Sequence, residues 1–325
     1  MAPLRHQSHN AGAISLRETI VGGRVKPPEV SPQDLFVRKN RLVVLVHGFN
    51  VTQTSADESF ADFERALRPE FQARLVRLYW PGDTSTPTDA LKGEQGFFTK
   101  RLISPLGYPW KPRDALQAAQ KLRTLLAKAF QERARAGLSD PLELCFVAHS
   151  LGCRLTLELL ERIIGSQAPV ASGPNGALEV PLTVLMAAAV PRYAVLTAGD
   201  FRDTIDQLRR LWILHSRRDS VLSFVFRPGQ LFERAYFPDF RLSVRGAVGR
   251  RGMPQADRVS VVEGIWDHGD YWRDEEIAKA VETQLSGVRT DLDASAGLRK
   301  AIAERRARQR SVAPREVTAL PLRPR

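Results

Sequence analysis

The chain has 325 residues and a hydrophobic content of 43%, which provides a large buried core and excludes an intrinsically disordered protein. Its longest apolar run, residues 182–190, is too short for a transmembrane helix, and residues 1–20 lack the apolar segment of a secretory signal peptide. The two cysteines form no disulfide framework, so we expect a cytoplasmic protein.

The net charge of +12 lies mainly at the two ends of the chain. Residues 1–40 carry +3 and residues 299–325 carry +7, which leaves +2 for the segment between them. A basic tail of this kind can attract an anionic membrane surface weakly. No basic motif interleaved with aromatic residues is present, so specific nucleic-acid binding is not expected.

Composition divides the chain into three segments. We predict an extended, partly ordered leader at residues 1–40, an α/β domain at residues 41–288 and a basic C-terminal tail at residues 289–325. The tail has a helical pattern from Ala294 to Gln309. No internal repeat is found, so a single large domain is expected.

Apolar runs of strand length alternate with helical patterns along the α/β domain. The expected strands are residues 42–46, 73–80, the apolar run that starts at Leu142 and ends in the turn around Ser150, and residues 182–190, 211–215 and 259–262. The expected helices are residues 56–67, 114–134, the segment from Ser150 to Gly165, 200–208 and 274–285. Continuous apolar strands are typical of parallel sheets that are buried on both faces. The pattern therefore predicts an α/β fold with a mostly parallel sheet flanked by helices on both faces.

Two long stretches have no clear periodicity. Residues 81–112 and 223–257 are rich in Gly, Pro and aromatic side chains. Loops of this length in a compact domain are often functional, so both are candidate lid segments over a site. The alternative is a surface excursion whose aromatic side chains pack back onto the domain.

The apolar run that starts at Leu142 ends in a tight turn around Ser150, and a helical pattern follows at once. Strand, sharp turn and helix are the context of a nucleophile elbow, in which a serine hydroxyl stands above the edge of the sheet. Ala148 and Gly152, two residues before and two after the serine, are both small, as such a turn requires. The alternative is that Ser150 only caps the helix that follows.

A serine hydroxyl needs a base that takes its proton, and the base needs a third group that orients it. Such groups lie beyond the carboxyl ends of the strands in an open α/β sheet. Of the six histidines, His268 alone follows the last expected strand, and we predict it to be the base. The alternative is an ordinary histidine of a surface loop. His149 adjoins the serine and is expected to point away from the site as a bystander.

Asp219 is the predicted acid, because it follows the expected strand at residues 211–215. Its alternative role is to cap a short helix that begins after it. The rival acids in neighbouring positions are Asp200, Asp203, Asp267 and Asp270. The last two flank His268 too closely in sequence to orient its ring well. The chain order is then Ser150, Asp219 and His268.

Acyl transfer builds negative charge on a carbonyl oxygen, which fixed N–H groups must stabilise. One predicted donor is the backbone N–H of Leu151, directly after the serine. The other is the backbone N–H of Phe49, in the loop after the first expected strand. Gly48 precedes it and allows the backbone to approach closely.

Together these pieces resemble a serine hydrolase of the α/β-hydrolase superfamily, in which the triad follows the order serine, acid, histidine. The matching residues are His47-Gly48-Phe49-Asn50, Ala148-His149-Ser150-Leu151-Gly152, Asp219 and His268. The resemblance covers about residues 41–285. The chain is also similar to an uncharacterised bacterial branch of that superfamily, through Trp80-Pro81 and the spacing of His268 and Tyr271.

The resemblance implies esterase- or lipase-like hydrolysis of a small-molecule ester or acyl substrate through an acyl-serine intermediate. The alternatives are a thioesterase, acyltransferase or peptidase with the same triad, and a non-catalytic binding module. The sequence has no GxGxxG, no Walker A motif and no metal-spaced His/Cys cluster, so we expect no cofactor and no metal ion.

Overall fold

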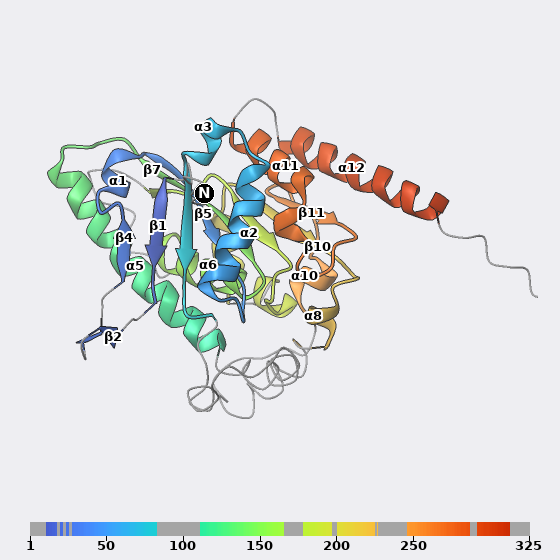
Figure 1. Ribbon diagram of the computed structural model, residues 1–325, viewed down its shortest axis with the longest axis horizontal. Coiled ribbons are helices and arrows are strands. Elements are labelled where there is room, and N and C mark those ends of the chain that lie inside the picture. The colour runs from blue at the N-terminus through green and yellow to red at the C-terminus, as the bar shows by residue number, and fades with distance from the viewer. Residues whose placement is uncertain are drawn as a thin grey trace, which may run out of the picture.

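A nine-stranded sheet runs through the protein (Figure 1). The computed structural model describes residues 11–17, 20–21, 24–25, 28–82, 111–165, 178–196, 200–224, 226, 246–286 and 291–312. The strands of the sheet are β1 (Gly12–Ser15), β4 (Glu29–Ser31), β5 (Arg41–Val46), β6 (Leu75–Tyr79), β7 (Leu142–His149), β8 (Leu178–Glu179), β9 (Thr183–Met186), β10 (Leu211–His215) and β11 (Val259–Glu263). A separate antiparallel pair is formed by β2 (Ile20–Val21) and β3 (Arg24–Val25).

The order of the strands is β11-β10-β9-β7-β5-β6-β1-β4, and β8 also pairs with β7. All neighbouring strands are parallel except β4, which is antiparallel to β1. The expected α/β fold with a mostly parallel sheet is therefore confirmed. Because the strands are parallel, the carboxyl ends of β5, β7, β10 and β11 meet at one edge of the sheet.

Helices alternate with the strands and cover the sheet. They are α1 (Leu35–Arg38), α2 (Gln53–Arg65), α3 (Pro69–Gln72), α5 (Lys111–Arg135), α6 (Leu151–Ile163), α7 (Arg202–Gln207), α8 (Ser220–Phe224), α10 (Val248–Arg251), α11 (Glu275–Leu285) and α12 (Asp291–Val312), with 3-10 turns η2 (Arg192–Val195) and η3 (Tyr271–Arg273). In Figure 1, α2 lies in front of the sheet and α5 and α6 lie behind it. Helix α2 contacts α11, and α5 packs against α6.

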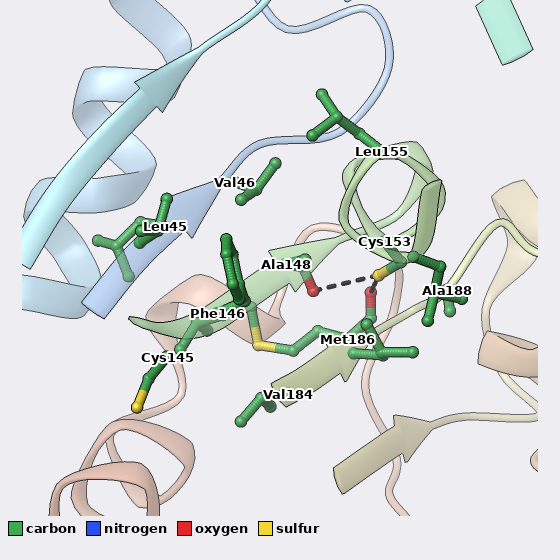
Figure 2. Packing of buried hydrophobic residues seen from close by; sticks show 14 of the residues in the cluster. Leu45, Val46, Cys145, Phe146, Ala148, Cys153, Leu155, Val184, Met186 and Ala188 are labelled. Carbon is green, nitrogen blue, oxygen red and sulfur yellow. Dashed lines mark hydrogen bonds between the residues drawn. The ribbon is translucent and has the colours of Figure 1, made fainter. Parts of the chain in front are cut away.

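The core lies around the middle strands. Every residue of β9 and β10 is buried, as is nearly all of β7, because helices cover both faces there. Figure 2 shows Cys153 at the start of α6, whose Sγ donates to the carbonyl oxygens of Ala148 and Met186 at 3.2 and 3.4 Å. The other cysteine, Cys145, is a buried free thiol, and burial raises its pKa to about 12.

Two of the expected segments differ clearly from the structure. The segment expected as an extended leader contributes β1 and β4 to the sheet, with Ile14 and Leu16 buried in the core. The strand expected to reach Val190 ends at Met186, because Ala187 has a φ of 47° and turns the chain out of the strand.

The basic C-terminal segment is also more structured than a solvated tail. Figure 1 shows α12 as a long helix that starts beside α11 and extends away from the sheet. Its Leu298 and Ile302 are buried. Arg305 forms an ion pair with Asp274 at 2.6 Å, and Arg306 donates to the carbonyl oxygen of Gly264 at 3.1 Å. The first part of this helix is thus docked on the body.

Residues 83–110, 225 and 227–245 make up most of the two candidate lid segments and lie outside the described residues. Within the part of the chain that the structure describes, no helix is long and apolar enough to cross a membrane.

Candidate active site

Ser150 occupies the sharp turn between β7 and α6. Its φ of 54° and ψ of −122° lie in a region that side chains rarely adopt. Backbone hydrogen bonds hold the turn: the Ser150 N–H donates to Met186 O at 2.9 Å, and its carbonyl accepts from Cys153 and Ala189 at 3.1 Å each. The hydroxyl makes no capping bond to α6, which rules out the simple helix-cap alternative.

Ser150, His268 and Asp219 form one hydrogen-bonded chain of side chains. Ser150 Oγ lies 3.0 Å from His268 Nε2, and His268 Nδ1 lies 2.8 Å from Asp219 Oδ2. A carboxylate only accepts, so Nδ1 carries the proton and Nε2 is left to accept from the serine. The structure therefore brings together the three predicted side chains in the geometry of a nucleophile, a base and an orienting acid.

Asp219 is fully buried and makes the contacts that both of its predicted roles would need. While Oδ2 faces His268, Oδ1 accepts from the backbone N–H of Leu222 at 2.8 Å and caps the short helix α8. One carboxylate can therefore make both contacts together. Because both oxygens are engaged, the carboxylate is fixed in position relative to the imidazole ring.

The loop that carries His268 is tied to the loop that carries Asp219. Asp267 Oδ1 accepts from Ser220 N at 3.2 Å and from Ser220 Oγ at 3.0 Å. The pKa of Asp267 is lowered, mainly by a hydrogen bond from the His268 backbone N–H and further by the two bonds from Ser220. The Asp267 N–H donates in turn to Asp270 Oδ2 at 2.8 Å. Both rival acids of this loop therefore shape the loop around His268.

The other two rivals are elsewhere. Asp200 lies in a turn and Asp203 lies in α7, and both are exposed. Neither has the burial and the fixed hydrogen bonds that hold Asp219 against the ring of His268.

The two glycines of the site allow the loop after β5 to touch the serine turn. A Cβ on Gly48 would lie 2.8 Å from Ser150 Cβ, and one on Gly152 would lie 2.4 Å from His47 O. Both distances are closer than real side chains approach. The loop after β5 therefore packs directly against the turn. Phe49 follows Gly48 in this loop, and the donor role of its N–H stays a prediction.

Further contacts fix the same loop. Asn50 has a φ of 56°, and its N–H donates to Gly82 O at 3.1 Å, in the loop after β6. His47 stacks on Trp80 and accepts from the Trp80 N–H at 3.3 Å, while the Trp80 indole donates to His47 O at 2.9 Å. Leu151, the other predicted donor, is the first residue of α6, where N–H groups have no partner within the helix.

His149 is the residue that the sequence reasoning missed. The expectation that it points away from the site as a bystander is wrong, because its ring centroid lies 4.8 Å from that of His268 and its Nε2 lies 2.7 Å from the carbonyl oxygen of His268. Burial lowers the pKa of His149 to about 3, and the neighbouring His268 charge contributes. The residue before Ser150 therefore contacts the backbone of the predicted base.

No protein-family model matches the chain, and no curated protein has significant sequence similarity to it. Within the described ranges, no three His, Cys, Asp or Glu side chains are arranged to hold a metal ion. The fold and the site define an α/β protein in which Ser150, His268 and Asp219 are linked by side-chain hydrogen bonds at the carboxyl edge of the sheet.

Proposed function

We propose that the protein is a serine hydrolase of the α/β-hydrolase class that cleaves carboxylic esters through an acyl-serine intermediate. The observation that carries this proposal is the chain Ser150–His268–Asp219, with distances of 3.0 and 2.8 Å, built on a serine with a φ of 54°. The chain order serine, acid, histidine and the position of the serine between β7 and α6 also support this class.

The first half of the reaction forms the acyl-enzyme. Ser150 Oγ attacks the ester carbonyl carbon while its proton passes to His268 Nε2. The negative charge that develops on the carbonyl oxygen is met by the N–H groups of Phe49 and Leu151. His268 then gives the proton to the departing alcohol, and the carbon–oxygen bond of the ester breaks. Asp219 keeps the imidazole in the Nδ1–H form and stabilises its charged state.

The second half restores the enzyme. His268 Nε2 takes a proton from a water molecule, whose oxygen attacks the acyl carbon. The bond to Ser150 Oγ breaks, and the serine regains its proton from His268. The carboxylic acid leaves, and no cofactor is needed for any of these steps.

Covalent labelling tests the proposal directly. A fluorophosphonate probe is expected to label the wild-type protein through Ser150 Oγ with loss of fluoride, and Ser150→Ala is expected to remain unlabelled. Hydrolysis of nitrophenyl esters should fall by about 10⁴-fold or more in the same variant. The matched control is Ser55→Ala, at an exposed position of α2. Equal labelling of the wild type and Ser150→Ala contradicts the proposal.

A panel of substrates then sets the reaction class. We expect esters to turn over faster than matched thioesters and amides, and a chain-length series of nitrophenyl esters should give the preferred acyl size. Faster reaction with thioesters would indicate a thioesterase, and faster reaction with amides would indicate a peptidase, instead of an esterase. Labelling of Ser150 without turnover of any substrate would indicate a binding module on the same fold.

A further inference from the structure

The ring of His149 is held between the serine turn and the loop of the proposed base. It is the last residue of β7 and is buried, with an exposed fraction of 6%. Its ring centroid lies 4.8 Å from that of His268 and 5.9 Å from that of Tyr271 in η3. It therefore contacts a segment that follows it by more than a hundred residues, while being bonded directly to Ser150.

The direction of its hydrogen bond follows from chemistry. A carbonyl oxygen only accepts, so the 2.7 Å contact with His268 O requires a proton on His149 Nε2. Burial favours the neutral ring, which then has one N–H and donates it here. The bond holds the backbone of His268, whereas the Asp219 carboxylate holds the ring of the same residue at 2.8 Å.

These two bonds fix His268 at both ends. With its backbone held by the residue before the nucleophile and its ring held by Asp219, Nε2 has little freedom to leave Ser150 Oγ. Because His149 and Ser150 are adjacent, any small shift of the turn moves the serine and the anchor of the base together. A misplacement of about 1 Å in a reacting group can cost about 100-fold in rate.

We propose that His149 is a positioning residue that fixes the distance between base and nucleophile by donating its Nε2–H to the His268 carbonyl. This inference rests on the proposed function, because it assigns His268 as the base. The competing explanation is that the His149 ring matters only as an aromatic filler against Tyr271 and Trp272, whose rings lie 5.9 and 6.1 Å away.

Two substitutions separate donation from packing. His149→Gln keeps an N–H donor near the position of Nε2 and loses the ring, whereas His149→Phe keeps the ring and loses the donor. We expect His149→Phe to lower kcat and the rate of fluorophosphonate labelling by about tenfold or more, with KM within about twofold, and His149→Gln to stay within about threefold of wild type. His149→Met is a second donor-free variant, and urea unfolding checks that each chain is folded.

An NMR measurement makes the test independent of turnover. The Nδ1 proton shared between His268 and Asp219 should give a strongly deshielded signal that disappears in His268→Gln. We expect His149→Gln to keep this signal and both donor-free variants to broaden or shift it. Wild-type reactivity and an unchanged signal in His149→Phe would overturn the inference, as would equal losses in His149→Phe and His149→Gln. If the signal behaves as expected but Ser150 never reacts, the positioning role stands and the proposed function fails.

Discussion

At the residue scale, the buried His149 makes folding stability depend on pH. Its pKa is lowered to about 3 in the folded protein, against 6.5 for an unperturbed histidine. Between these values the unfolded chain binds a proton at this site and the folded chain does not. The free energy of unfolding therefore falls as pH falls through this window, by up to about 1.4 kcal/mol per pH unit, and this contribution is constant above pH 6.5.

Comparison with His149→Gln isolates this effect. Urea unfolding of both proteins between pH 7.5 and 4 should show a shallower pH dependence in the variant, which has nothing to protonate at position 149. Other groups with lowered pKa values, such as Asp267 and Asp274, titrate in both chains and cancel in the difference. Parallel pH profiles would mean that this histidine is not held neutral.

The sequence could predict which side chains meet at the site, but not all of the contacts that hold them. Ser150, Asp219 and His268 each follow an apolar run, and parallel strands bring such positions to one edge. The contact of His149 involves a backbone carbonyl, and every residue has one. No side-chain pattern therefore indicates it before the chain is folded.

At the element scale, the strands that were predicted well are those with continuous apolar runs. β10 has the expected bounds, β7 begins at Leu142 as expected, and β5 begins one residue earlier than expected. The short strands β1 and β4 were not expected, because their polar and small residues resemble a linker. They form because β1 pairs with β6, more than sixty residues away, and such long-range pairing leaves no local signal.

The contact between β5 and α6 at Gly152 gives a test of element packing. Gly152→Ala would place a Cβ 2.4 Å from His47 O and 3.0 Å from Val46 O, and these are backbone atoms that cannot rotate away. We expect a loss of about 2 kcal/mol or more in the free energy of unfolding, with slower labelling of Ser150. Helix propensity alone predicts the opposite sign, a gain of up to about 1 kcal/mol.

Gly297→Ala is the matched control, because Gly297 is exposed in α12 and a Cβ there would meet nothing within 4 Å. Urea unfolding should show a stability equal to or above that of wild type for this variant. If Gly152→Ala were as stable as Gly297→Ala, the loop after β5 would not be packed against the serine turn as described.

At the scale of the whole molecule, the C-terminal helix supports the segment that carries His268. Arg305 of α12 pairs with Asp274, and the same carboxylate accepts from the Trp266 indole at 2.6 Å, two residues before His268. Arg299 donates to Val261 O at 3.3 Å in β11. The excess of positive charge at this end of the chain is thus used partly to attach the helix to the body.

Arg305→Met tests this support, because methionine keeps much of the apolar stem and removes the charge. Asp274 would remain buried without its cation, so we expect a loss of about 1–2 kcal/mol in the free energy of unfolding, limited by the partial exposure of the arginine. Labelling of Ser150 should also slow. Lys300→Met, at an exposed position of the same helix, serves as the control. Equal stability of the two variants would show that the ion pair contributes nothing.

The positive φ of Ser150 lowers the stability of the fold at the same position that supplies the proposed reactivity. Holding a non-glycine residue in this conformation costs on the order of 1–3 kcal/mol, and the surrounding hydrogen bonds must offset that cost. Glycine would adopt the same turn with little strain, but it would have no hydroxyl to react. Among variants at position 150, the most stable fold is therefore expected from a residue that cannot carry out the chemistry. Selection for stability alone would favour glycine there.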